Sequence, residues 1–197
     1  MTFRNNETFE SFIRKMELTP ELEQTFETLI EERTFKRGDT ITSEGDLRNY
    51  IFYIAKGSSR VYYIRSGKEH TYSFALEEEF ITLARPLIAD SNNVTTIEFL
   101  EPTVIYMLPL HKTHTLLRQY DFSTIAQIIN GIFKGLSKHI CDLEERILML
   151  QTLSAKDRYN WLATRYPKIL ERANMTQIAS YIGVTKETLY RIRAGKY

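Results

Sequence analysis

The sequence predicts an α+β fold with N-terminal helices, an antiparallel β-barrel of the jelly-roll kind, one long helix and a C-terminal helix-turn-helix unit. Two observations predict it. Apolar residues recur at helical spacing before about residue 34 and again after residue 110. Between these points they alternate at strand spacing, and glycine-containing turns separate the runs. We expect three parts, with boundaries at 1–122, 123–150 and 151–197.

The first 33 residues have mixed helical periodicity. Phe9, Phe12 and Ile13 fall on one helical face. Pro20 suits the first turn of a second helix, because proline lacks the N–H that would be unsatisfied there, and Thr19 suits its N-cap. Two or three short helices are therefore expected in this segment.

The segment from about 34 to 109 carries the signals of short antiparallel strands. Its apolar runs are rich in β-branched and aromatic residues: 50–56, 59–65, 69–75, 94–101 and 103–109. Ser66-Gly67 lies directly between two runs, which predicts a tight hairpin. The acidic run Glu77–Glu79 falls in an expected turn, where solvent would surround its charges. Many short strands with regular turns favour a small barrel or jelly roll.

From Ser123 onward the helical period continues in one long stretch. Apolar residues follow one another in steps of three or four: Ile125, Ile129, Ile132, Leu136, Ile140, Leu143, Ile147 and Leu150. This is close to a coiled-coil seam, and it extends over roughly 39 Å at 1.5 Å per residue. Gly131 and Gly135 weaken an isolated helix, which indicates close packing. The series from Ile125 to Ile147 is the predicted dimer interface; burial against the helix's own barrel is the alternative.

The C-terminal part begins with a predicted helix over 155–165, which Ser154 caps and Pro167 ends. A short turn at 168–172 is expected next. Two short helices then follow on either side of Gly183, a residue that suits the positive φ of the turn between them.

The residues around these two helices support the same interpretation. Asn174 and Gln177 have the spacing of a capping box, and Thr185 suits the N-cap of the second helix. Ala179 is small enough for the point where the helices cross. The spacing therefore predicts a helix-turn-helix unit, whose second helix lies in the major groove of DNA.

The second helix of this unit has a polar outer face. Its cap and outer side hold the residues that we expect to contact DNA: Thr185, Lys186, Glu187, Tyr190, Arg191 and Arg193. Arginine bonds guanine through two donors, glutamate accepts from cytosine, and lysine neutralises phosphate. A solvated amphipathic helix at the end of a domain is the alternative.

Charge is unevenly distributed along the chain. The net charge is +1, yet residues 151–197 hold nine Lys or Arg against three Asp or Glu, while residues 1–150 hold seventeen against twenty-two. A basic C-terminal segment after an acidic N-terminal segment is typical of a nucleic-acid-binding unit attached to another domain. No apolar run approaches the roughly 18 residues of a membrane span, and the N-terminus is too polar for a signal peptide. A cytoplasmic protein with no membrane partner is expected.

The order of helices, barrel, long helix and helix-turn-helix resembles the Crp/Fnr superfamily of bacterial transcription regulators over essentially the whole chain. The motifs that carry the resemblance are Gly38-Asp39 with Glu44-Gly45-Asp46, and the segments 52–57, 153–158 and 178–192. The family commonly reads bases through an Arg-Glu-Thr-x-x-Arg pattern.

The resemblance implies specific roles and partners for this chain. Lys186, Glu187 and Arg191 match the base-reading pattern, with a lysine in place of its first arginine. Lysine is a point charge rather than a bidentate fork, so the preferred DNA sequence is expected to differ. The resemblance further implies a homodimer, double-stranded DNA and RNA polymerase as partners. Many members continue into a β-hairpin wing; this sequence ends four residues after Arg193, so no wing is expected.

In cyclic-nucleotide-binding members, a Gly-Glu pair and an Arg followed by a small hydroxyl residue hold the phosphate. Here Thr82-Leu83 replaces the pair, and Val94 stands before Thr95-Thr96 in place of the arginine. A buried phosphate without that cation would be costly, so cAMP binding is not expected. Arg85 is the basic residue nearby, and Leu143 stands where a hydroxyl is expected on the adenine side. The weak ligand-contact candidates are Thr82, Leu83, Arg85, Thr95, Thr96 and Leu143.

The sequence lacks the residues that other sensors and enzymes need. An iron–sulfur cluster needs about four cysteines, whereas the chain has Cys141 alone, and its four histidines have no metal-ligand spacing. No metal and no cofactor are expected. Cys141 is expected to be a packed thiol, with a redox role across the dimer as the alternative. No nucleophile–base pair or phosphate-binding loop is found, so an enzyme is not expected.

Three functional hypotheses follow. The first is a homodimeric, sequence-specific transcription regulator that does not respond to cAMP. The second is a regulator controlled by an effector, either a cyclic nucleotide held through Arg85 or another small molecule. The third is a ligand-binding or protein-interaction module whose terminal helices only pack and bind no DNA.

Overall fold

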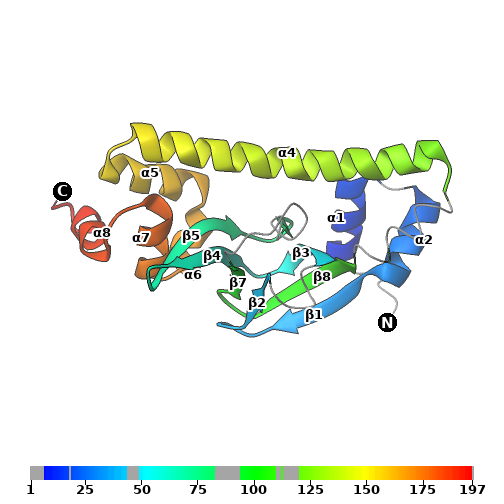
Figure 1. Cartoon of the computed structure of the whole chain (residues 1–197), viewed down its shortest axis with the longest axis horizontal. Helices are drawn as coiled ribbons and strands as arrows, with labels where there is room; N and C mark the ends of the chain where they lie inside the picture. The colour runs from blue at the N-terminus through cyan, green and yellow to red at the C-terminus, as the bar shows by residue number, and fades with distance from the viewer. Residues whose placement is uncertain are drawn as a thin grey trace.

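The computed structural model describes residues 7–17, 19–43, 49–82, 94–109, 112 and 120–196. In this part of the chain the elements follow in the order α1 (Glu7–Met16), α2 (Pro20–Leu29), β1 (Glu31–Phe35), β2 (Thr40–Thr42), β3 (Tyr50–Lys56), β4 (Ser59–Arg65), β5 (Lys68–Ala75), β6 (Phe80–Thr82), β7 (Thr95–Phe99), β8 (Thr103–Pro109), α4 (Phe122–Thr152), α5 (Ala155–Arg165), α6 (Pro167–Arg172), α7 (Met175–Ile182) and α8 (Lys186–Arg193). Figure 1 shows α4 running along one side of the molecule, from α1 and α2 at one end to α5 and α8 at the other.

The strands form two antiparallel four-stranded sheets, with the orders β1-β8-β3-β6 and β2-β7-β4-β5. Alternate residues of each sheet point to a shared apolar core, in which Phe52, Ile54, Ile97, Ile105 and Met107 are fully buried. The α+β class with an antiparallel β domain is therefore confirmed. The jelly-roll connection and the absence of a wing stay predictions.

Two turns of the β domain lie where the sequence predicts them, and one of them forms ion pairs that the sequence does not predict. Ser66 and Gly67 both have positive φ, at 52° and 72°, so the tight hairpin is confirmed as a primed two-residue turn. The turn at Glu77–Glu79 is also present, and Glu78 is exposed as expected, but the expectation of solvated charges is wrong for Glu77 and Glu79. Glu77 pairs with Arg172 at 2.7 Å, and Glu79 pairs with Lys138 at 2.7 Å. The motif Glu44-Gly45-Asp46 lies outside the described residues.

The N-terminal helices cover one end of the β domain. Phe9 and Phe12 of α1 are buried against Tyr53 and Tyr106, and Ile128 of α4 joins the same cluster. The prediction of short helices in this segment is confirmed for α1 and α2. Thr19 occupies the N-cap of α2, although its side chain forms no capping hydrogen bond.

The long helix α4 begins after Asp121, whose carboxylate accepts from the backbone N–H of Thr124 at 2.8 Å. This hydrogen bond holds the pKa of Asp121 below its usual value. The predicted long helix is confirmed, with one residue more at its start and two more at its end. In the stretches of chain that the structure describes, no helix is both long and apolar enough to cross a membrane.

The C-terminal helices pack around a third apolar cluster. Leu162 of α5, Ile169 of α6, Ile182 of α7 and Leu189 of α8 are fully buried in it, together with Leu100 of the β domain. The helix over 155–165 with its Ser154 cap is confirmed. The turn expected at 168–172 is wrong, because Pro167 begins a six-residue helix there.

Candidate nucleic-acid interface

The helix-turn-helix unit has the local structure that its sequence predicts. Asn174 and Gln177 form a complete capping box at α7, and Gly183 ends that helix in the left-handed conformation at φ 68°. Thr185 caps α8 by accepting from the backbone N–H of Thr188 at 3.1 Å. Ala179 is buried at the crossing of the two helices. These caps and this turn fix the direction in which α8 leaves the unit.

One face of α8 anchors the helix and the other is open to solvent. Leu189 and Ile192 are buried, whereas all six residues expected to contact DNA are exposed: Thr185, Lys186, Glu187, Tyr190, Arg191 and Arg193. The Lys186 ammonium lies 5.8 Å from the centre of the Tyr190 ring, and Arg193 turns back to donate to the sulfur of Met175 at 3.1 Å. Lys186, Glu187 and Arg191 therefore share a charged outer surface, and Arg193 lies at its rim.

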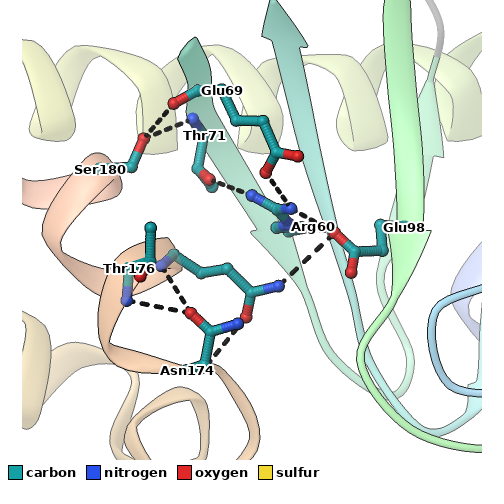
Figure 2. Close-up of polar contacts among 8 residues, drawn as sticks. Arg60, Glu69, Thr71, Glu98, Asn174, Thr176 and Ser180 are labelled. Atoms are coloured by element: carbon teal, nitrogen blue, oxygen red, sulfur yellow. Dashed lines mark hydrogen bonds and ion pairs between the residues drawn. The ribbon is translucent and has the colours of Figure 1, made fainter.

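Helix α7 docks directly on the edge strand β5. The Ser180 hydroxyl accepts from the backbone N–H of Thr71 at 2.9 Å and donates to the carbonyl of Glu69 at 3.1 Å (Figure 2). The ring of Tyr181 lies 4.9 Å from that of Phe74. Ser180 thus satisfies backbone groups that an edge strand would otherwise expose, and it ties the helix-turn-helix unit to the β domain.

A buried arginine supports this contact from the sheet side. Arg60 of β4 is 4% exposed; its guanidinium pairs with the carboxylates of Glu69 and Glu98 and donates to the Thr71 hydroxyl at 3.1 Å (Figure 2). The Gln177 amide reaches Glu98 at 3.5 Å. The network extends from β4 through β5 and β7 to α7. The alternation within run 59–65 places Arg60 on the outer face, but no sequence signal indicates that α7 covers it.

Further arginines bond to carbonyl groups around the same unit. Arg146 of α4 donates to the carbonyls of Tyr181 and Thr71, and Arg158 of α5 donates to those of Leu150 and Ile182. Burial lowers the pKa of Arg146, and burial raises the pKa of Tyr181 to about 12 although Arg146 opposes that rise.

Part of the basic charge of residues 151–197 is therefore structural. Arg158 joins helices, and Arg165, Lys168 and Arg172 form ion pairs with acidic residues of α4 and the β domain. Four cations on and after α8 face solvent, namely Lys186, Arg191, Arg193 and Lys196, and Lys156 of α5 does so as well.

The structure describes some of the weak ligand-contact candidates. Thr95 and Thr96 are both buried in β7, where neighbouring residues point to opposite faces; Thr96 shares a face with Glu98, and Thr95 shares the inner face with Ile97. Thr82 ends β6 beside Ile51. Leu83 and Arg85 lie outside the described residues. Thr95 and Thr96 are not among the residues that line the cavity beside Leu143.

Leu143 instead lines a cavity of about 260 Å³ between α4 and the β5–β6 region. Aromatic rings and charged groups of α4 share the lining: Tyr72, Phe74, Phe80, Tyr166, Lys138 and His139. Lys138 bonds to Glu79 at 2.7 Å, and this partner raises its pKa although burial acts against the rise. In the described ranges, no group of three or more His, Cys, Asp or Glu side chains could hold a metal.

The outer side of α4 carries a continuous apolar stripe. Of the predicted interface residues, Ile129, Leu136, Ile140 and Ile147 are exposed, while Ile125 and Leu143 are half-buried; the side chain of Ile132 is outside the described set. Phe133, which is 63% exposed, lies on the same stripe. Sequence reasoning missed it, although its spacing of four from Ile129 and three from Leu136 is the signal for it. Cys141 is exposed in the chain, so the expectation of a packed thiol is wrong for a single copy.

Comparison with protein families gives a match for the β domain. Residues 32–120 match the family model of the cyclic nucleotide-binding domain. The β domain is therefore similar to the cyclic nucleotide-binding domain, and the long helix and the helix-turn-helix unit lie beyond this match. No curated protein has significant sequence similarity to it.

Solved structures define the fold of the whole chain. A Crp/Fnr-family transcriptional regulator from Eubacterium rectale is similar with a TM-score of 0.71 and 16% identity over 94% of this chain and 87% of that one. The c-di-GMP responsive regulator CLP of Xanthomonas campestris gives 0.68 and 15% over 88% and 89%. FixK2 from Bradyrhizobium japonicum gives 0.64 and 18% over 84% and 83%. The chain has the Crp/Fnr fold, and the resemblance found in its sequence is confirmed at the level of the fold.

Proposed function

We propose that this protein is a homodimeric, sequence-specific DNA-binding transcription regulator of the Crp/Fnr type that acts without cAMP. The observation that carries the proposal is the division of α8 into two faces. Leu189 and Ile192 fix the helix to its domain, and the polar side chains on its other face are exposed. An exposed helix with that polar face, held by a capped helix-turn-helix, is suited to the major groove.

Specific residues of α8 carry the proposed readout. Glu187 and Arg191 are four residues apart and therefore lie on one side of the helix. Arg191 is suited to guanine and Glu187 to the amino group of cytosine. Lys186 lies one residue before Glu187 and is suited to a phosphate or a base edge. Thr185 and Tyr190 flank these groups and would contact the backbone.

The apolar stripe of α4 supports the homodimer. Phe133, Leu136, Ile140 and Ile147 project from a helix that α1 and the β domain cover only on its other side. A second copy packed along the same stripe would remove these side chains from water, which stabilises by about 25 cal/mol for each Å² buried. A two-fold dimer would present two α8 helices to half-sites about 34 Å apart.

A second candidate concerns effector control. The cavity beside Leu143 and His139 lies between the β domain and α4, so a small molecule bound there would contact both. The interior of the β domain is lined by apolar side chains such as Ile81 and Ile97, which supports an effector other than a charged cyclic nucleotide. We further propose that this regulator contacts RNA polymerase and is located in the cytoplasm.

Selection of bound fragments from the source genome tests the proposal. Purified protein would be used with and without cAMP. We expect enrichment of one two-fold symmetric site, equally strong in both conditions. Enrichment only with cAMP would contradict independence from the nucleotide. No enrichment in either condition, followed by unchanged results with small-molecule extracts, would favour an interaction module that binds no DNA.

A further inference from the structure

The tip of the β4–β5 hairpin presents two cations side by side. Arg65 and Lys68 are directly opposite in the strand ladder, on either side of the Ser66-Gly67 turn. Both are exposed, and neither forms an ion pair with any residue that the structure describes. Like charges directly opposite each other destabilise a hairpin. The fold alone therefore gives no reason for this pair.

This tip lies at the end of the molecule that carries α8 (Figure 1). An open groove of about 970 Å³ is lined by residues of the hairpin strand β5 and of α5, α7 and α8. Its polar lining includes lysines, a histidine and hydroxyl groups: Lys68, Lys186, His70, Thr176, Thr185 and Thr188. The groove thus joins the hairpin to the N-terminal end of the helix proposed to read DNA.

The hairpin is held in this position by polar contacts. Ser180 bonds to the backbone of both Glu69 and Thr71, and Lys68 directly precedes Glu69 (Figure 2). The carboxylate of Glu69 is paired with Arg60, which it shares with Glu98, so the sheet offsets part of the negative charge of the groove's acidic residue. The lining holds three cationic side chains, Lys68, Arg158 and Lys186, against the one carboxylate of Glu69, so the groove is positively charged on balance. The Ser180 contacts fix the hairpin relative to α7.

We propose that the hairpin tip is a second contact with the DNA backbone, in which Arg65 and Lys68 neutralise phosphates beside the half-site that α8 reads. This inference rests on the proposed function and extends its surface beyond the helix-turn-helix unit. Backbone contacts position a protein on DNA and carry no sequence information. The hairpin therefore contributes affinity and salt dependence, and α8 contributes the sequence preference.

The test replaces both cations by neutral residues, in the variant Arg65→Gln/Lys68→Gln. Binding to the selected site would be measured against salt concentration. Each lost phosphate contact should reduce the slope of log K against log salt by about 0.9, so a dimer with two hairpins should lose up to about 3.6. The relative affinities for single-base variants of the site should stay as in the wild type.

Lys36→Gln/Arg37→Gln is the matched control, because these two exposed cations lie in the β1–β2 turn of the same domain and outside the groove. It should keep the wild-type slope. A wild-type slope in the hairpin variant would overturn the inference, as would loss of transcription activation at an unchanged slope, which would assign the tip to a protein partner. If the wild-type protein binds no fragment at any salt concentration, the proposed function itself fails.

Discussion

Two helices of this molecule expose an outer face to solvent, and the two faces differ in chemistry. On α4 the face is apolar, and Phe133 and Ile140 are 63% and 54% exposed. On α8 the face is polar, and it carries Lys186, Glu187 and Arg191. Both helices bury their other side against the same molecule.

The apolar face of α4 and the polar face of α8 indicate a binding partner in different ways. Apolar side chains in water are a free-energy deficit, so a long exposed stripe indicates a partner by its energetics alone. Charged side chains are well solvated, so a polar face indicates nothing without a pattern around it. For α8 that pattern is the capping box at Asn174, the left-handed Gly183 and the cap at Thr185. Four experiments probe these two faces and the parts of α4 and of the helix-turn-helix unit that adjoin them.

The first prediction addresses the α4 stripe. Leu136→Asp should convert the dimer to monomers, because each copy would place a charge against its partner's apolar surface. The penalty is several kcal/mol for each ion, so the dimer should weaken by roughly 1,000-fold or more. Sedimentation velocity across a concentration series measures this change.

Gln127→Asp is the control for that experiment. Gln127 is exposed and precedes Leu136 by nine residues, which places it on the opposite side of the helix at 100° per residue. This variant should remain dimeric. A dimer that persists in Leu136→Asp at low concentration would remove the stripe from the interface.

The second prediction addresses the polar face. Arg191→Ala should cost about 1–3 kcal/mol of binding to the selected site and relax the preference at one base position. Arg37→Ala removes an exposed arginine from the β1–β2 turn and should change neither quantity. Competition between the site and its single-base variants provides the measurement. Equal losses for every sequence would make Arg191 a phosphate contact instead.

The third prediction concerns the junction where α4 meets the helix-turn-helix unit. A Cβ on Gly183 would lie 3.0 Å from a methyl carbon of Leu150, in a residue with φ of 68°. Gly183→Ala should therefore lower the free energy of unfolding through both strain and crowding, by about 1–3 kcal/mol. Gly67→Ala has a similar φ of 72° with open space around it, so it measures strain alone. A loss no larger than that of Gly67→Ala would show that Leu150 moves aside at little cost.

The sequence predicts local structure well wherever neighbouring residues determine it. The caps at Ser154, Asn174 and Thr185 and the turns at Ser66-Gly67 and Gly183 depend on residues within four positions of one another. The long helix follows from periodicity over many turns in the same way. Element order then leads to the fold, because few arrangements bury all these apolar faces.

Contacts between distant segments have no comparable signal. Ser180 and Glu69 are 111 residues apart, and Arg60 meets Glu98 on another strand. The sequence around Glu77 indicates a solvated turn, because its partner Arg172 lies in the distant helix α6. Net charge misleads for the same reason, because counting Arg158 and Arg172 cannot distinguish groups that join helices from groups that face solvent.

The last prediction concerns the inner side of α4, where the half-buried His139 lines the cavity beside the β domain. Burial lowers the pKa of His139, and nearby Lys138 adds to this effect while Asp142 opposes it. The folded protein therefore binds this proton less readily than the unfolded chain, so the free energy of unfolding should fall as pH drops below about 6.5 and should be unaffected by His139 above that value. Denaturant unfolding at pH 7.5 and 5.5 should show a smaller fall in His139→Gln than in the wild type. If the free energy of unfolding falls equally in both proteins, groups other than His139 cause the loss of stability in acid.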